Sequence, residues 1–243
     1  PCGVERRAAY ELKFLIEDRL AAEVETWSRR ALKPDPHGQS ELGGAYRTTS
    51  LYFDTPELDV YHRSPKYRRR KFRARRYGLT SWVYLERKRK SGDRVSKRRV
   101  VVPESDLARL AGELGPEDWA GRWFHRRIAV RRLMPACRLA YSRTAYAGVC
   151  PEGPIRLTLD REIRGILSED WRLEPFEGGI PILSGRVILE LKFVDAVPLP
   201  FKSLMQDLRL TPKSVSKYRL CREAWGAVTR AVPGPLRGEV SSA

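Results

Sequence analysis

Long apolar runs and paired cysteines are both missing from this sequence. No apolar run approaches the roughly 20 residues that a membrane-spanning helix needs, and the charged first ten residues lack the apolar core of a signal peptide. The four cysteines, Cys2, Cys137, Cys150 and Cys221, have no CxxC pairing, and a chain of 243 residues does not need disulfides to be stable. We therefore expect reduced thiols and a cytoplasmic protein, peripheral at a membrane only through a partner.

Histidine and phosphate-binding glycine loops are scarce as well. The three histidines, His37, His62 and His125, lack metal-ligand spacing, and no glycine-rich phosphate loop is present. What the chain has in excess is positive charge, with 47 Lys and Arg against 30 Asp and Glu, a net charge of +17. This excess favours a polyanionic partner such as nucleic acid, acidic membrane or polyphosphate. Since 42% of residues are hydrophobic, the charge belongs to a folded scaffold.

The hydrophobic pattern predicts strands interrupted by helices. Strand patterns occupy 9–16, 47–53, 69–77, 81–90, 94–102, 137–147, 155–164 and 186–194. Apolar and polar residues alternate in most of them, and 47–53 is rich in Thr, Tyr and Phe. Helical patterns occupy 17–32, 57–62, 103–134 with Gly and Pro interruptions, 201–208 and 214–231, and Pro34, Pro36 and Gly38 predict a loop over 34–44. We expect one domain over residues 1–231 and a disordered tail over 232–243.

The polar positions of these strands carry long, mostly basic side chains. Phe72-Arg73-Ala74-Arg75 and Leu189-Glu190-Leu191-Lys192 are examples. In an ordinary sheet such alternation means only that one face meets water. If helices cover the apolar faces instead, the charged faces converge inside a closed sheet. The pattern thus favours an α+β fold, an antiparallel β-barrel with a cationic interior and helices packed outside.

Cations gathered in such an interior require a counter-charge, because desolvating an unpaired charge costs several kcal/mol. Glu11, Glu86 and Glu190 lie on the same faces. They are too few to neutralise the bases, yet they suit a hard divalent cation whose coordination phosphate oxygens would complete. Glu190 could equally be the internal counter-ion of Lys192 or of an arginine. A phosphate ligand would balance the basic side chains, and a divalent metal would bind the carboxylates.

Several short motifs occur in an order typical of a known family. They are Tyr10-Glu11-Leu12-Lys13-Phe14, Thr49-Ser50-Leu51-Tyr52-Phe53-Asp54-Thr55, Lys71-Phe72-Arg73-Ala74-Arg75-Arg76-Tyr77-Gly78, Glu86-Arg87-Lys88, Tyr141-Ser142-Arg143, Arg156-Leu157-Thr158-Leu159-Asp160, Ile188-Leu189-Glu190-Leu191-Lys192 and Ser216-Lys217-Tyr218. With this ordered set the chain resembles the VTC domain, the polyphosphate-polymerase module of the CYTH-like triphosphate tunnel metalloenzymes. The resemblance spans about residues 10–222.

The resemblance implies a tunnel that binds nucleotide and polyphosphate through inward Lys and Arg, with manganese or magnesium as cofactor. Catalytic contacts would come from Arg73, Arg75, Lys88, Arg143 and Arg156. Phosphate or nucleotide binding would involve Lys13, Lys97, Arg99, Tyr141, Lys192, Ser216 and Lys217. Glu190 would hold the metal, with Glu11 and Glu86 as further candidate ligands.

One position departs from the hydrolytic tunnel enzymes, which carry an ExExK strand. The first acidic position of that pattern is Ala9 here, in Ala9-Tyr10-Glu11-Leu12-Lys13. A tunnel with fewer carboxylates should position water less well, which favours synthesis or binding over hydrolysis.

Four functions remain open at this point. The leading hypothesis is a polymerase that adds the terminal phosphoryl group of ATP to a polyphosphate chain, with a membrane protein needed for any export. The alternatives are a noncatalytic module that binds polyphosphate or inositol phosphate and, behind it, a triphosphatase. Nucleic-acid binding through residues 66–76 ranks last, because that run continues into alternating strands.

Overall fold

The structure, a computed structural model, describes residues 6–92 and 94–231. The predicted tail over 232–243 and Cys2 lie outside these residues. Within the described chain, Cys137, Cys150 and Cys221 are free thiols, as expected. No described helix combines the length and the apolar character that crossing a membrane requires.

Strands make up most of the regular secondary structure of the described residues. They are β1 (Arg6–Glu17), β2 (Lys33–Pro34), β3 (Ala45–Asp54), β4 (Arg70–Tyr77), β5 (Trp82–Ser91), β6 (Arg94–Pro103), β7 (Met134–Cys150), β8 (Gly153–Leu167), β9 (Ile180–Pro181) and β10 (Arg186–Phe193). The α-helices are α1 (Asp18–Ala31), α2 (Asp59–His62), α3 (Arg122–Ala129), α4 (Leu199–Asp207) and α5 (Lys217–Ala231), and the 3₁₀ helices are η1 (Ser40–Leu42) and η2 (Glu104–Ala111).

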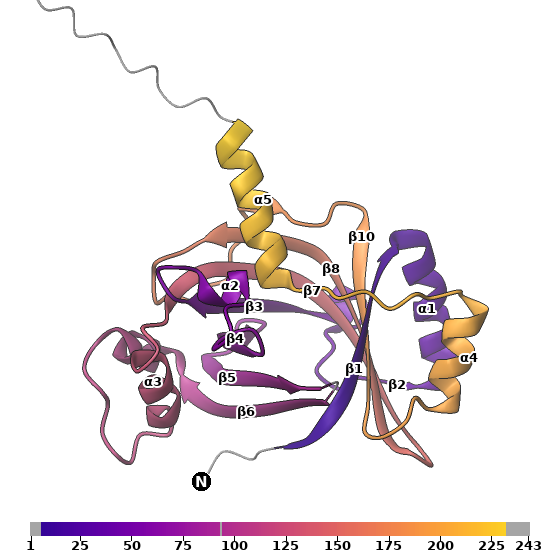
Figure 1. Ribbon diagram of the computed structural model, residues 1–243. Coiled ribbons are helices and arrows are strands. Elements are labelled where there is room, and N and C mark those ends of the chain that lie inside the picture. Colours follow the sequence, from indigo (N-terminus) through magenta and orange to yellow (C-terminus); the bar gives the residue numbers. More distant parts are fainter. Residues whose placement is uncertain (1–5, 93, 232–243) are drawn as a thin grey trace, which may run out of the picture.

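Eight strands of the described chain close into a ring (Figure 1). Antiparallel pairing runs in the order β7-β3-β4-β5-β6-β1-β10-β8, and β8 pairs back with β7 from Cys137 to Cys150. The short strands β2 and β9 extend the sheet beside β7 and β8. The predicted antiparallel α+β fold with external helices is confirmed, and the predicted barrel takes the form of this ring.

Alternation along each strand sends apolar side chains outward to the helices. On one side, α1 and α4 cover β1, β8 and β10, with Phe14 and Phe201 fully buried between them. On the other side, Phe53 and Phe72 pack against Phe124 of α3. Burying these rings stabilises each interface by about 1.5–3 kcal/mol per side chain. With both outer faces covered, the polar faces of the strands meet inside the ring.

The helical prediction for 103–134 is only partly right. Residues 104–111 form the 3₁₀ helix η2, residues 122–129 form α3, and an irregular segment containing Gly112, Gly115, Pro116 and Gly121 separates them. Glycine and proline at this density interrupt helical hydrogen bonding. The predicted loop over 34–44 contains only the short elements β2 and η1.

Candidate functional site

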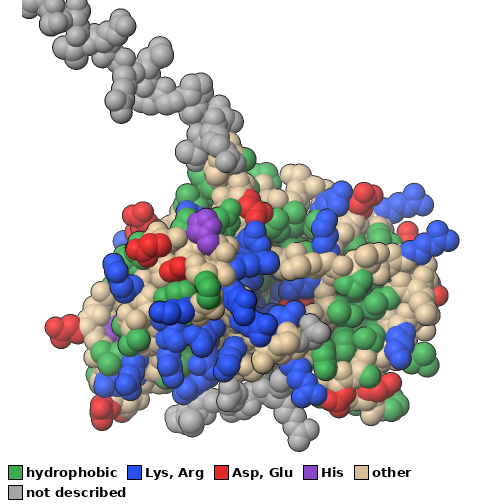
Figure 2. All heavy atoms as spheres, in the orientation of Figure 1, with side chains coloured by type: hydrophobic (Ala, Val, Ile, Leu, Met, Phe, Trp, Pro, Cys, Tyr) green, Lys and Arg blue, Asp and Glu red, His purple; other side chains and the backbone are tan. Residues whose placement is uncertain are grey.

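A cavity of about 1000 Å³ lies inside the ring. Its wall consists of inward side chains from the strands, together with residues at the start of α5. Among described residues, eleven Lys and Arg line the cavity against three carboxylates, those of Glu11, Asp35 and Glu190. Figure 2 shows Lys and Arg side chains gathered around a hollow in the face below the start of α5. Such a surplus concentrates a positive potential inside the ring.

The pairing of β1 with β10 builds a cluster of acids and lysines. Lys13 lies opposite Glu190, and Glu11 lies opposite Lys192. Lys13 Nζ donates to Glu190 Oε2 and lies 2.9 Å from Glu11 Oε1. Lys88 Nζ donates to Glu11 Oε1 at 2.6 Å, and Lys192 Nζ lies 2.6 Å from Glu190 Oε1. Both carboxylates are therefore held between lysines.

These contacts set the protonation of the cluster. Burial and the neighbouring Glu190 oppose ionisation of Glu11, but the surrounding lysines outweigh both and lower its pKa to about 2. Burial also opposes ionisation of Glu190, yet Lys13 and Lys192 hold its pKa well below the usual range. Both carboxylates are thus ionised at neutral pH.

Glu86 has a different place from the other two acids. Its Oε2 accepts a hydrogen bond from Arg73 Nε at 2.6 Å and its Oε1 accepts one from Lys97 Nζ at 2.6 Å. The residue is 1% exposed and does not line the cavity. Glu86 is a buried counter-ion that fixes two cavity-lining cations, and its role as a metal ligand stays a prediction.

Asp160 on β8 is also a buried counter-ion for cavity-lining cations. It is fully buried, and Arg143 donates to both of its oxygens, from Nε at 2.6 Å and from Nη2 at 2.8 Å. Lys217 Nζ donates to Asp160 Oδ2 at 2.5 Å. The Tyr141 ring lies beneath these cations, 4.8 Å from Lys217 Nζ and 5.4 Å from the Arg143 guanidinium carbon. A bidentate Arg–carboxylate pair of this kind fixes the guanidinium rigidly.

Arg156 lies where the loop after α1 meets the ring. It donates to Asp35 Oδ2 and, at 3.3 Å, to the Tyr46 hydroxyl. Asp35 in turn accepts a hydrogen bond from the His37 amide at 3.0 Å. The Arg156 side chain stays 36% exposed, so it keeps donor capacity toward the cavity.

Lys71 lines the cavity near α5 and was not predicted as a site residue. Its Nζ donates to Ser216 Oγ at 2.8 Å. Burial, followed by the nearby charges of Lys88 and Lys13, lowers its pKa to about 7. Burial likewise lowers the pKa of Lys88 to about 8, against the favourable charge of Glu11. An anion in the cavity would favour the charged form of these lysines.

The structure brings together nearly all of the predicted site residues. Those that line the cavity are Glu11, Lys13, Arg73, Arg75, Lys88, Lys97, Arg99, Arg143, Arg156, Glu190, Lys192, Ser216 and Lys217. Tyr141 and Glu86 are buried, at 3% and 1% exposed, and do not line the cavity. Sequence reasoning missed Lys71, although it is in phase with Arg73 and Arg75 on β4. It also missed Asp35, which lies outside every predicted strand.

Divalent-metal binding can be tested against this donor set. In residues 6–92 and 94–231 no group of three or more His, Cys, Asp or Glu is placed to hold a metal ion. Glu11 and Glu190, however, line the cavity and share Lys13 between them. Mg²⁺ is commonly bound by one or two carboxylates, with substrate phosphates and water completing its shell. Two carboxylates in a cavity lined by Lys and Arg match that number of protein ligands.

Solved structures share this fold. A protein from Pyrococcus horikoshii OT3 is 15% identical with a TM-score of 0.50, and the match covers 89% of this chain and 99% of that one. A candidate adenylate cyclase from Bacillus halodurans is 12% identical with a TM-score of 0.52, covering 86% and 94%. A candidate adenylyl cyclase from Hippeastrum, described as having a dominant triphosphatase activity, is 14% identical with a TM-score of 0.50, covering 89% and 96%.

A comparison with curated protein sequences gave no significant match. The family comparison is decisive, because the model of the VTC domain matches residues 8–225, which include seven ring strands in full and β1 from residue 8 onward. The eleven cavity-lining cations and the three cavity-lining carboxylates all fall inside this match. The chain belongs to the VTC domain family.

Proposed function

We propose that this protein is a polyphosphate polymerase, which transfers the terminal phosphoryl group of ATP to a growing polyphosphate chain inside the ring. Family membership and the shared fold support a polyphosphate-related or triphosphatase-type function. The observation that carries the proposal is the surplus of eleven cavity-lining cations over three carboxylates. A linear chain of phosphates supplies the repeated negative charge that such a wall requires.

The transfer consists of one bond made and one broken. A terminal oxygen of the polyphosphate attacks the γ-phosphorus of ATP, the bond from that phosphorus to the β-phosphate bridging oxygen breaks, and ADP leaves. Arg73, Arg75 and Arg143 bind the phosphate oxygens and keep the reacting groups in line. Such positioning and charge neutralisation provide most of the catalysis of phosphoryl transfer.

Glu190 and Glu11 would hold the divalent metal, which when bound neutralises charge developing on the phosphates. Lys13 and Lys192 keep both carboxylates ionised, which is the form that binds a metal ion. Ala9 lines the cavity at the position where the hydrolytic pattern has an acid. Its methyl group cannot orient water, which favours a phosphate acceptor over water.

Incubation with ATP and manganese tests the proposal. The expected products are ADP and polymer, with one phosphate added to polymer per ADP formed. Glu190→Gln should abolish the metal-dependent synthesis and weaken manganese binding measured by calorimetry, whereas Glu57→Gln, outside the cavity, should change neither. Free phosphate without polymer would indicate a triphosphatase, and synthesis unchanged by Glu190→Gln would refute the metal site.

One observation favours a second candidate, a module that binds polyphosphate without turnover. Both oxygens of Glu190 are engaged by lysines, Lys13 and Lys192, which could replace a metal as the counter-charge. That candidate predicts tight tripolyphosphate binding without manganese and no ADP from ATP in the same assay.

A further inference from the structure

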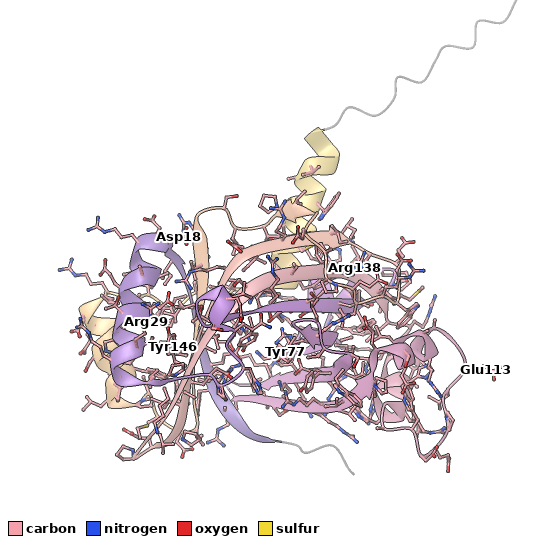
Figure 3. All side chains as sticks on the ribbon, turned by 180° about the vertical axis from the view of Figure 1, so that it is seen from behind. Asp18, Arg29, Tyr77, Glu113, Arg138 and Tyr146 are labelled. Carbon is pink, nitrogen blue, oxygen red and sulfur yellow. The ribbon has the colours of Figure 1, made fainter. Side chains whose placement is uncertain are left out.

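A row of aromatic rings lines one rim of the cavity, where the turn between β4 and β5 lies. Tyr46 and Tyr77 meet edge to face with ring centroids 5.7 Å apart, and Tyr77 and Tyr84 do so at 5.3 Å. Trp82 lies two residues before Tyr84 on the same face of β5 and also lines the cavity. Figure 3 shows Tyr77 within the ring of strands, seen from behind. Four rings from three neighbouring strands thus share one stretch of wall.

Core packing does not account for this row. Trp82 is 53% exposed and Leu79, in the turn beside it, is 81% exposed, although both line the cavity. Polyphosphate offers only charged oxygens and has no surface that such groups would recognise. An apolar surface that stays uncovered beside a binding cavity marks a contact for a ligand with an apolar part.

The rings adjoin the phosphate-binding cations directly. The guanidinium carbon of Arg99 lies 4.8 Å from the Tyr84 ring centroid, and that of Arg75 lies 5.9 Å from the Tyr77 centroid. A ligand that spans both surfaces must carry a flat aromatic group at one end and phosphates at the other. A nucleoside triphosphate has this form.

We infer that Trp82, Tyr84 and Tyr77 form a stacking platform for the base of a nucleoside triphosphate whose phosphates reach Arg99 and Arg75. This inference rests on the proposed function and adds to it the site that separates the nucleotide donor from the polyphosphate acceptor. Any base has an aromatic face, so the platform recognises nucleotides as a class. Stacking on an aromatic side chain changes affinity by roughly tenfold per base.

Calorimetry with two probes, ATP and inorganic tripolyphosphate, tests the platform on the full chain. The variants are Trp82→Leu, which removes the ring, and Trp82→Phe, which keeps a smaller one. The matched control is Trp123→Phe on α3, whose ring packs with Arg98 outside the ring of strands at 4.4 Å. Trp82→Leu should weaken ATP roughly tenfold and leave tripolyphosphate within twofold. Trp82→Phe should recover most of the loss, and Trp123→Phe should bind both probes as the parent does.

The outcomes separate the two proposals. Equal loss of ATP and tripolyphosphate in Trp82→Leu, or no loss of either, overturns the platform while leaving the polyphosphate site intact. Failure of the unaltered protein to bind either probe overturns the proposed function itself. Because Trp82 is half exposed, its replacement should leave the melting temperature nearly unchanged, and Tyr84→Leu provides a second variant with the same expected selectivity.

Discussion

Three buried lysines should change charge when an anion binds inside the ring, namely Lys71, Lys88 and Lys97. Burial lowers the pKa of Lys71 to about 7 and those of Lys88 and Lys97 to about 8. Between these values and the ordinary 10.5 the folded, ligand-free protein binds fewer protons than the unfolded chain. The contribution of these lysines to stability therefore rises with pH over this window.

A bound polyanion raises the pKa values of these lysines, because it favours their charged form. We expect tripolyphosphate binding at pH 8 to take up protons, and affinity to fall as pH rises from 7 to 9. Calorimetry in buffers of different ionisation enthalpy measures the proton uptake. Lys71→Met should reduce it, while Arg89→Met on the outer face of β5 should not. Proton release on binding would contradict the prediction.

Asp160 is the residue on which two cavity-lining cations depend. Replacing it with Asn leaves Arg143 and Lys217 buried without a counter-charge, which typically costs about 3–5 kcal/mol. We expect urea unfolding of Asp160→Asn to show a loss of this size. Tripolyphosphate should restore part of it by supplying negative charge.

The exposed Asp170→Asn is the control for Asp160, with an expected change within about 0.5 kcal/mol. Equal effects of the two substitutions would show that Asp160 does not neutralise the cavity-lining pair.

At the scale of elements, α5 is attached to the ring through its first turn. The Tyr218 hydroxyl donates to Asp54 Oδ2 at 2.5 Å, and its ring stacks on Tyr52 with centroids 5.8 Å apart. Ser216 and Lys217, just before it, bond to Lys71 and Asp160. The same turn that places two predicted phosphate contacts therefore also fixes the helix.

Removing the Tyr218 hydroxyl should loosen this attachment. A buried hydrogen bond to a carboxylate contributes about 1.5–3 kcal/mol, so Tyr218→Phe should lower the free energy of unfolding by about 2 kcal/mol. Amide exchange should accelerate in α5 and stay unchanged in α1. Tyr67→Phe, which loses only a 3.3 Å bond to the Arg131 carbonyl, should have a smaller effect on stability and none on α5.

Periodic elements are the part of the fold that the sequence predicts well. The eight ring strands and α1 were predicted to within a few residues of their observed ends, because each presents several turns or alternations of pattern. The two-residue strands β2 and β9 carry no such signal. Residues 112–121 form no helix, because the glycines and the proline in this segment interrupt the apolar spacing that suggested one.

At the scale of the whole molecule, ligand binding and stability should be coupled. The cations inside the ring repel one another, so tripolyphosphate should raise the melting temperature in proportion to its affinity. The rise should shrink between 50 and 500 mM KCl, since salt screens the attraction. Lys88→Met should weaken the rise and Arg89→Met, the neighbouring outward residue, should not. A rise independent of salt would contradict a charge-driven site.

Strand phase alone determines that Arg73, Arg75 and Glu190 line the cavity, as the alternation predicts, and their roles there stay predictions. Strand phase does not reveal partners that come from elsewhere in the chain. Glu86 has the same strand phase as Lys88, which lines the cavity. Arg73 and Lys97 nevertheless bond to both oxygens of the Glu86 carboxylate, and Glu86 does not line the cavity. Asp35 lies in a loop that no strand periodicity encodes, whereas the aromatic rings at the cavity rim lie on β3, β4 and β5.

β8 pairs with β10 on one side and with β7 on the other, and these two pairings close the ring. The other ring strands also pair with their neighbours, β1 with β6 through Arg6, Ala9 and Tyr10, so we expect a long ligand to enter through a rim of the ring. A linear phosphate polymer reaches the cations by threading a free end past a rim, whereas a large cyclic polyphosphate of the same charge cannot be threaded. Free chain ends, rather than total phosphate, should then limit occupancy.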